Sequence, residues 1–182
     1  MTPAPPLLLM TPGPSRVPDR VLAAGAQPVM HHRTPEFSEQ LGAVVEMMRP
    51  LFGTSGDVLP VHTTGRGAME ATICNLFSPG DELIACCNGK FGNMWSGFAE
   101  SHGLTVHRVC KDWSQGLALD EIDAAITESP TAKAVLVVHS DTSTGVLNDV
   151  KAVAAVARDN GRLCLVDSIS GVGGVEFRFD EW

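Results

Sequence analysis

Residues 162–174 have the sequence RLCLVDSISGVGG, in which an apolar run ends at a single acid, Asp167, and a glycine-rich stretch follows. A second run, AVLVVH at 134–139, is apolar at nearly every position. Successive apolar side chains are typical of a strand whose two faces are both buried, as in a parallel sheet covered by helices. The two runs therefore predict strands of a buried parallel sheet, and Asp167 marks the carboxyl end of one of them.

Apolar runs of this kind alternate with segments of helical periodicity along most of the chain. We expect strands at 57–61, 82–87, 104–110, 134–139 and 162–167, and helices at about 67–77, 92–102, 119–128 and 149–159. This alternation predicts right-handed βαβ units and a three-layer, doubly wound α/β domain with a mostly parallel sheet. Ligands of such sheets bind beyond the carboxyl ends of the strands, so the loops at 62–67, 88–91, 140–145 and 168–174 matter most.

The N-terminal part of the chain has a different pattern. Residues 1–16 are rich in proline and are expected to form an extended arm, and residues 17–182 a single domain. Short and longer helices are predicted at 17–26 and 34–52. Thr34 suits the N-cap of the longer helix and Pro35 its first position, whereas Pro50 should kink or end it.

Composition excludes some classes of function. The 182 residues carry a formal net charge of -8, which argues against nucleic acid or an anionic membrane as the main partner. The N-terminal sequence MTPAPPLLLM lacks the basic region of a signal peptide, and no apolar stretch approaches the length of a membrane span. None of the five cysteines forms a C-x-x-C pair, so we expect reduced, structural thiols and a cytoplasmic protein.

Two glycine- or hydroxyl-rich loops are candidate ligand sites. In VHTTGRGAMEA (61–71), Gly65 and Gly67 would allow a sharp bend into a helix whose first amides suit a phosphate. Taken alone, the pattern is more often just a tight entry into a helix. In HSDTSTGVLND (139–149), Thr142 and its neighbours follow a strand end. These hydroxyls would either satisfy the backbone of a turn or contact a ligand.

Phe91 and Asp167 also allow two interpretations each. Phe91 is the aromatic residue nearest the expected cleft, where it would stack on a flat ring or pack into the core at a helix start. Asp167 would cap the following segment or pair with a protonated ring nitrogen, as in enzymes that use pyridoxal 5'-phosphate (PLP). A phosphate site, a flat-ring site, a hydroxyl and a carboxylate together outline that cofactor.

The chain resembles the N-terminal part of a class V, fold-type I aminotransferase, in particular the alanine–glyoxylate, serine–glyoxylate and serine–pyruvate group. The matching motifs follow one another in order over nearly the whole chain: LLMTPGPSRVPDRVL (8–22), HRTPEF (32–37), TTGRGAMEA (63–71), NLFSPGDELI (75–84), NGKFG (88–92), VVHSDTSTGVLND (137–149) and LVDSISGVGG (165–174). The resemblance implies that this chain is the PLP-binding large domain of such an enzyme, which acts as a homodimer on small amino acids and keto acids.

The resemblance also assigns roles to individual residues. It implies that Thr64, Gly65 and Arg66 form the phosphate-binding turn, with the backbone amides more important than the Arg66 charge. Thr142 would bind the phenolic oxygen of the cofactor, and Asp167 its pyridine nitrogen.

Three further residues match the family's site. Phe91 would stack on the ring, at a position where the family often has tryptophan, and Ile169 would pack against the opposite face. Gly13 would approach the substrate.

Two parts of the family's site have no match in this chain. The Schiff-base lysine would follow the DEW stretch, and the chain ends at that tryptophan, Trp182. The arginine that binds the substrate carboxylate belongs to the C-terminal small domain, which we expect to be absent. The chain's own lysines do not match the catalytic position and are expected on the surface: Lys90, Lys111, Lys133 and Lys151. The resemblance thus implies an incomplete large domain that is inactive alone.

Two alternatives remain open at the level of sequence. One is a non-catalytic doubly wound module that binds a phosphorylated ligand or a protein partner. The other is a different class V reaction, such as ureidoglycine–glyoxylate transamination. No metal site is expected under any of these interpretations.

Overall fold

A computed structural model describes residues 8–182 of the chain. Residues Met1–Val44 and Val45–Trp182 form two compact units, which are described separately here. In the first unit, residues 8–18 contain no helix or strand, and α1 (Asp19–Gly25) follows directly after Pro18. The expected arm at 1–16 lies partly outside the described residues.

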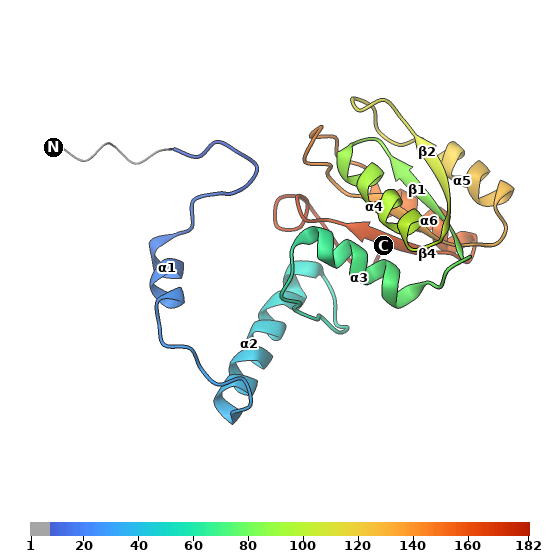
Figure 1. The fold of residues 1–182 in the computed structure, drawn as a ribbon. Helices are drawn as coiled ribbons and strands as arrows, with labels where there is room; N and C mark the ends of the chain where they lie inside the picture. Colours follow the sequence, from blue (N-terminus) through green and yellow to red (C-terminus); the bar gives the residue numbers. More distant parts are fainter. Residues whose placement is uncertain (1–7) are drawn as a thin grey trace. The chain divides into compact units, whose positions relative to one another are not determined.

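The second unit is built on a parallel sheet of four strands, β1 (Glu82–Cys87), β2 (Thr105–Cys110), β3 (Ala132–Val138) and β4 (Leu163–Asp167). The strand order is β2-β1-β3-β4, so the chain moves outward from β1 first to one side and then to the other (Figure 1). The last residues of neighbouring strands are paired, Cys87 with Cys110 and Val138 with Asp167. Loops that leave the strands therefore begin at one common edge.

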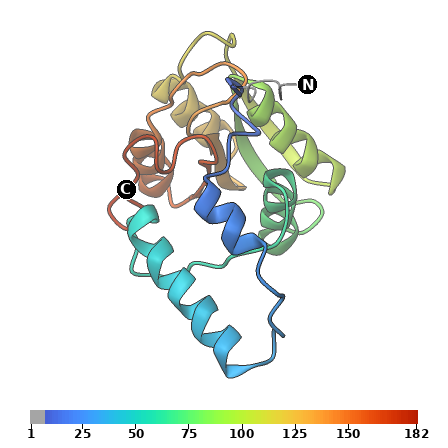
Figure 2. The same ribbon diagram turned by 90° about the vertical axis from the view of Figure 1, so that its left-hand side faces the viewer.

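Helices cover both faces of this sheet. Figure 2 shows α3 (Gly65–Leu76) and α4 (Lys90–Ser101), both green, on one side and α5 (Leu119–Glu128) and α6 (Val150–Asp159) on the other. The central strand β3 explains why two layers form, because its alternate side chains enter two different cores. Leu136 packs with the α3 and α4 residues, whereas Val135 and Val137 pack with those of α5 and α6. The predicted three-layer α/β architecture is confirmed.

The element predictions hold for the later strands and helices but fail at 57–61. These residues form no strand, and Leu59 and Val61 are exposed by 80% and 66%. The apolar run there has no partner strand among residues 8–182, and a strand needs hydrogen bonds from a neighbour to form.

The longer N-terminal helix forms close to its predicted bounds. Helix α2 spans Pro35–Phe52 and contains residues of both units. The Thr34 hydroxyl accepts a hydrogen bond from the Phe37 amide at 3.3 Å, as expected of an N-cap. Pro50 lies inside the last turn, and the helix ends two residues after it. Within residues 8–182, none of the helices has both the length and the apolar character needed to cross a membrane.

Candidate functional site

The loops that follow β3 and β4 meet at the carboxyl edge of the sheet. The Thr142 hydroxyl, after β3, lies 2.5 Å from the hydroxyl of Ser170, after β4. Deeper in the fold, the His139 amide donates to the Asp167 carbonyl at 2.8 Å, which continues the ladder between the two strands. Thr142 and Asp167 are thereby held on adjacent strand ends, as the sequence predicts.

Asp167 is half-buried at the end of β4, and only part of its hydrogen-bonding capacity is used. Its Oδ1 accepts from the Ile169 amide at 3.0 Å, which closes a local turn. No other hydrogen bond reaches the carboxylate from residues 8–182, so Oδ2 is available. Burial raises the pKa of Asp167, and the nearby charge of Asp141 raises it further. A desolvated carboxylate with an available oxygen favours a cationic N–H partner.

The strand end before Asp167 is further fixed by a buried histidine. His139 Nδ1 lies 2.8 Å from the Ser168 hydroxyl, and the imidazole is only 3% exposed. Burial lowers the pKa of His139. No sequence pattern singles out this pair. It joins the last residue of the apolar run at 134–139 to the residue that follows Asp167.

The start of α3 offers two free amides. Thr64 is the N-cap, and its hydroxyl accepts from the Gly67 amide at 3.2 Å, while the Ala68 amide donates to the Thr64 carbonyl. The amides of Gly65 and Arg66 precede Ala68, whose amide is the first to donate to a backbone carbonyl of the helix, and they have no partner among residues 8–182. Two free N–H groups at the positive end of a 12-residue helix suit an anion.

The two glycines of this turn lie close to the Ile169 and Thr63 side chains, and neither adopts a backbone conformation that only glycine favours. Both lie inside α3, and neither has a positive φ. A Cβ atom on Gly67 would lie 2.0 Å from the Thr63 hydroxyl oxygen. A Cβ atom on Gly65 would lie 2.8 Å from Ile169 Cδ1, so the start of α3 and the loop after Asp167 are in direct contact. Ile169 itself is 68% exposed.

Phe91 is the second residue of α4 and shows one of the two roles that the sequence left open, packing into the core. Its ring is half-buried and packs against the core cluster beneath α3 and α4. Its amide donates to Asp141 Oδ2 at 2.9 Å, so its backbone is tied to the loop that carries Thr142. Core packing is thus observed, and stacking on a bound ring stays a prediction.

Asp141 is a residue that the sequence analysis missed. Its side chain is completely buried between β3 and the start of α4. Four donors face the carboxylate: the amides of Phe91, Gly92 and Ser143 and the Ser143 hydroxyl. The signal that identified Asp167, an acid just beyond a buried strand, applies equally to Asp141.

A buried amide pair was also missed. Asn88 Nδ2 donates to Asn148 Oδ1 at 2.8 Å, and Asn148 Nδ2 donates back to Asn88 Oδ1 at 3.2 Å. Both residues are 2% exposed. The pair joins the end of β1 to the segment before α6, and Asn148 also donates to the Val138 carbonyl at 2.8 Å. It fixes the loops on either side of Asp141.

Two predicted residues are not part of this cluster as described. The Arg66 side chain is exposed and makes no hydrogen bond or ion pair within residues 8–182. Gly13 belongs to the first unit, so its approach to a substrate stays a prediction.

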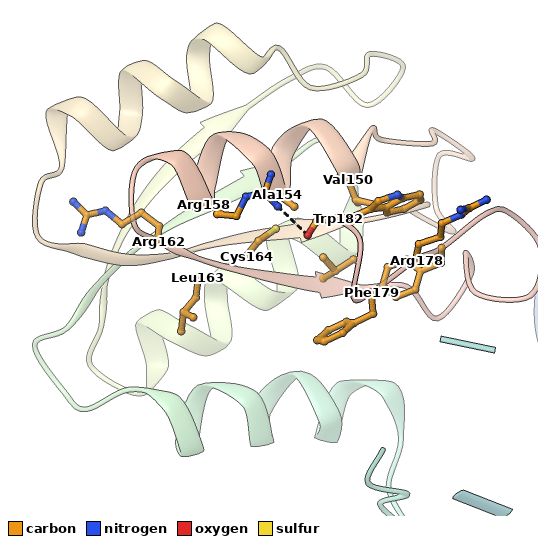
Figure 3. A pocket seen from close by; sticks show the side chains of 11 residues that line it. Val150, Ala154, Arg158, Arg162, Leu163, Cys164, Arg178, Phe179 and Trp182 are labelled. Atoms are coloured by element: carbon orange, nitrogen blue, oxygen red, sulfur yellow. Dashed lines mark hydrogen bonds between the residues drawn. The ribbon is translucent and has the colours of Figure 1, made fainter. Parts of the chain in front are cut away.

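A separate apolar cavity lies along β4 and does not contain the predicted residues. It has a volume of about 220 Å³ and lies between α6, β4 and the last residues of the chain. Figure 3 shows Val150 and Ala154 of α6 and Cys164 of β4 around it, with Arg158 donating to the Trp182 carbonyl at 3.2 Å. Three residues of β4, one of the two edge strands of the sheet, line it: Leu163, Cys164 and Val166.

A parallel sheet with helices on both faces, and loops gathered at its carboxyl edge, places the chain in the class of doubly wound α/β proteins. The family described as "Aminotransferase class-V" matches residues 8–182. The chain belongs to this family.

The chain is also similar to individual proteins over nearly its whole length. The chain is 39% identical over 178 residues to the "Soluble hydrogenase, small subunit" of Synechococcus, covering 96% of this chain and 46% of that protein. Among solved structures, it matches the alanine–glyoxylate aminotransferase from Nostoc with a TM-score of 0.92 at 32% identity, over 99% of this chain and 48% of the other. The ureidoglycine–glyoxylate aminotransferase from Bacillus subtilis also gives 0.92 at 32% identity, over 100% and 47%. The chain thus spans about half the length of these proteins, with the fold of the fold-type I aminotransferases.

Proposed function

We propose that the chain is the PLP-binding part of an aminotransferase that transfers an amino group between a small amino acid and a 2-keto acid. The observation that carries the proposal is the convergence of three features at one sheet edge. These are the free amides at the start of α3, the Asp167 carboxylate and the Thr142 hydroxyl, brought together through the Gly65–Ile169 and Thr142–Ser170 contacts.

The residues present fit the cofactor's chemical groups. The Gly65 and Arg66 amides, beside the Thr64 cap, suit the phosphate. The available Oδ2 of Asp167 suits a protonated ring nitrogen. The positive charge of that nitrogen would stabilise the ionised carboxylate and so offset the effect of burial, which raises the pKa of Asp167. Thr142 supplies a hydroxyl for the phenolic oxygen.

The exposed side chain of Ile169 and the accessible part of the Phe91 ring suit the two faces of a flat ring. Bound PLP supplies an electron sink for the bond changes at the substrate's α-carbon. In this proposal Asp167 keeps the proton on the ring nitrogen, and the surrounding loops hold the ring in one orientation.

Activity needs groups that this chain does not supply at the site. Within the described residues, Lys111 is paired with Glu121 and Lys133 with Asp81, the latter at 2.7 Å. Lys90 and Lys151 are exposed. We propose that the covalent lysine and the carboxylate-binding arginine belong to the part of the relatives that this chain does not span, and that residues 17–182 form one cofactor domain preceded by the arm at 1–16.

Alanine or serine as donor and glyoxylate or pyruvate as acceptor are the proposed substrates, by likeness to the relatives. Ureidoglycine is the second candidate donor, because the Bacillus subtilis structure is equally similar in fold.

Binding of a cofactor analogue tests the proposal on this chain directly. Pyridoxine 5'-phosphate has the phosphate, ring nitrogen and phenol of PLP but no aldehyde, so it cannot react with surface lysines. We expect saturable binding of one molecule per chain by isothermal titration calorimetry. Pyridoxine, which lacks the phosphate, should bind much more weakly.

The same titration separates the proposal from a non-catalytic phosphate-binding module. If inorganic phosphate or a sugar phosphate binds as tightly as pyridoxine 5'-phosphate, the ring contributes nothing and the module is favoured. If none of these probes binds to the chain, both the proposed function and the phosphate-binding module are contradicted.

We further propose that the protein acts as a homodimer in the cytoplasm. Helix α2 has no buried residue, and an apolar row on it is exposed, including Leu41, Val44 and Met47. An apolar surface of this kind supports association with a second copy. Free thiols at all five cysteines support a reducing compartment. Analytical ultracentrifugation tests the dimer.

A further inference from the structure

The completely buried carboxylate of Asp141 connects two loops of the proposed cofactor site. Its Oδ2 accepts from the Phe91 amide at 2.9 Å and from the Gly92 amide at 3.4 Å, in the first turn of α4. Its Oδ1 accepts from the Ser143 amide at 3.0 Å and from the Ser143 hydroxyl at 2.6 Å, in its own loop. One side chain therefore satisfies donors from two elements that are 50 residues apart in sequence.

The surrounding backbone is shaped around this carboxylate. A Cβ atom on Gly89 would lie 2.3 Å from Asp141 Cγ, so a larger residue at position 89 would displace the acid. Ser143 adds a second connection, because its hydroxyl accepts from the Lys90 amide at 2.9 Å. The Asp141 carbonyl also accepts from the amides of Thr144 and Gly145. The loop after β3 and the start of α4 consequently form one rigid unit.

Both residues proposed to contact the ring lie within this unit. Phe91 donates its amide to Asp141, and Thr142 lies between Asp141 and Ser143, whose positions are both fixed by the carboxylate. From this arrangement we infer that Asp141 is a positioning residue, which fixes the Phe91 ring and the Thr142 hydroxyl relative to each other so that a bound pyridine ring has one orientation. The inference rests on the proposed function and extends it to a residue that touches no ligand.

The charge of Asp141 acts on the same site. Burial has the larger effect in raising the pKa of Asp167, and the nearby negative charge of Asp141 raises this pKa further. Loss of this charge would make the Asp167 carboxylate a weaker base and a poorer partner for a protonated nitrogen. The geometry and the charge of Asp141 therefore both predict weaker binding of a protonated pyridine ring when Asp141 is neutralised.

Asp141→Asn is the most informative variant. An amide is nearly isosteric, but one acceptor oxygen becomes an NH2 group that must face either the Phe91 amide or the Ser143 amide, both of which are donors. Asp149→Asn is the matched control. Asp149 caps α6 by accepting from the Ala152 amide at 3.0 Å, so this control makes the same change of charge at another helix start.

The test compares the wild-type chain and both variants, each confirmed as folded by far-UV circular dichroism. Pyridoxine 5'-phosphate is titrated into each, and two quantities are measured: the Kd and the induced circular dichroism of the bound ring. The induced signal reports how uniquely the achiral ring is oriented. A purely structural cap would lower thermal stability without changing this signal per bound ligand.

We expect Asp141→Asn to weaken binding by about tenfold, equivalent to about 1.4 kcal/mol, and to reduce the induced signal per bound ligand at saturation. Asp149→Asn should match the wild type in both quantities. Equal Kd and equal induced signal for Asp141→Asn and the wild type would overturn the inference while leaving the proposed function intact. Absence of binding to the wild type would overturn the proposed function and the inference together.

A second variant covers the case in which Asp141→Asn does not fold. Ser143→Ala removes one of the four donors to the carboxylate and the acceptor for the Lys90 amide, but leaves the buried acid in place. We expect it to fold and to show a smaller loss of induced signal in the same direction. A wild-type signal in Ser143→Ala would then overturn the inference.

Discussion

Replacing Asp167 with asparagine should weaken binding of a protonated pyridine ring and spare that of a neutral one. The Asp167 Oδ1 accepts from the Ile169 amide at 3.0 Å, and the asparagine oxygen would keep this bond. The asparagine NH2 would then occupy the position of Oδ2, where it cannot accept the ring N–H. A hydrogen bond to a charged group contributes about 1.5–3 kcal/mol and a neutral one about 0.5–1.5. Because the asparagine offers no acceptor to the ring N–H, a loss of about 1.5–3 kcal/mol is expected, which corresponds to roughly 10- to 150-fold weaker binding.

The same variant should be more stable than the wild type without ligand at neutral pH. Burial raises the pKa of Asp167, so the folded protein binds the proton more tightly than the unfolded chain, whose value is near 3.8. The stabilising contribution of this group is therefore present below that value and is lost as pH rises through the raised pKa. Asparagine does not titrate, so its advantage should shrink as the pH falls toward the ordinary aspartate range.

Two measurements check these expectations. Urea denaturation at neutral and acid pH gives the difference in the free energy of unfolding, and ¹⁵N NMR of ring-labelled pyridoxine 5'-phosphate gives the protonation state of the bound nitrogen. A variant that is less stable than the wild type at neutral pH, or that binds the protonated ring with wild-type affinity, would refute the reasoning.

Five further substitutions, in three comparisons, test the surrounding structure. Gly65→Val should weaken binding of pyridoxine 5'-phosphate by about tenfold or more, because its Cβ would lie 2.8 Å from Ile169 Cδ1 and its side chain would crowd the free amides. Arg66→Ala should weaken binding by less than about threefold. Equal losses of affinity in calorimetry would contradict this expectation. Gly89→Ala should lower the free energy of unfolding by about 1–3 kcal/mol in urea melts, because the added methyl meets a buried carboxylate at 2.3 Å. Asn88→Ala and Asn148→Ala should be non-additive by about 0.5–3 kcal/mol in a double-mutant cycle, and strict additivity would show that the buried pair does not act as a unit.

The layered fold could be predicted because its signals are local. The run AVLVVH is apolar on both faces. In the structure, Leu136 packs in the core beneath α3 and α4, and Val137 packs in the core beneath α5 and α6. The run at 57–61, DVLPV, contains Asp57 and Pro60 and formed no strand. Strand formation depends on a neighbour far away in sequence, and the local pattern contains no information about that neighbour.

The site was predictable to the extent that it depends on single residues at strand ends. Thr142 and Asp167 lie where the topology of a parallel sheet puts its ligand loops, whereas the turn at Thr64 follows no strand of the sheet. The glycines at 65 and 67 were correctly placed in this turn. They lie close to the Ile169 and Thr63 side chains, and only coordinates show contacts of that kind.

Asp141 and Asp167 show what separates a structural carboxylate from one that can take a ligand. Both follow apolar strands, and these strands are neighbours in the sheet. Asp141 is fully buried and is faced by four donors, so a ligand could bind it only by displacing the start of α4. Asp167 has one donor on Oδ1, is half-buried and is repelled by the first acid. Asp167 has an oxygen without a hydrogen-bond donor and lies near the negative charge of Asp141, whose oxygens already have donors. A cation that carries an N–H group therefore stabilises Asp167 most. The saturation of Asp141 therefore helps to make Asp167 selective for such a ligand.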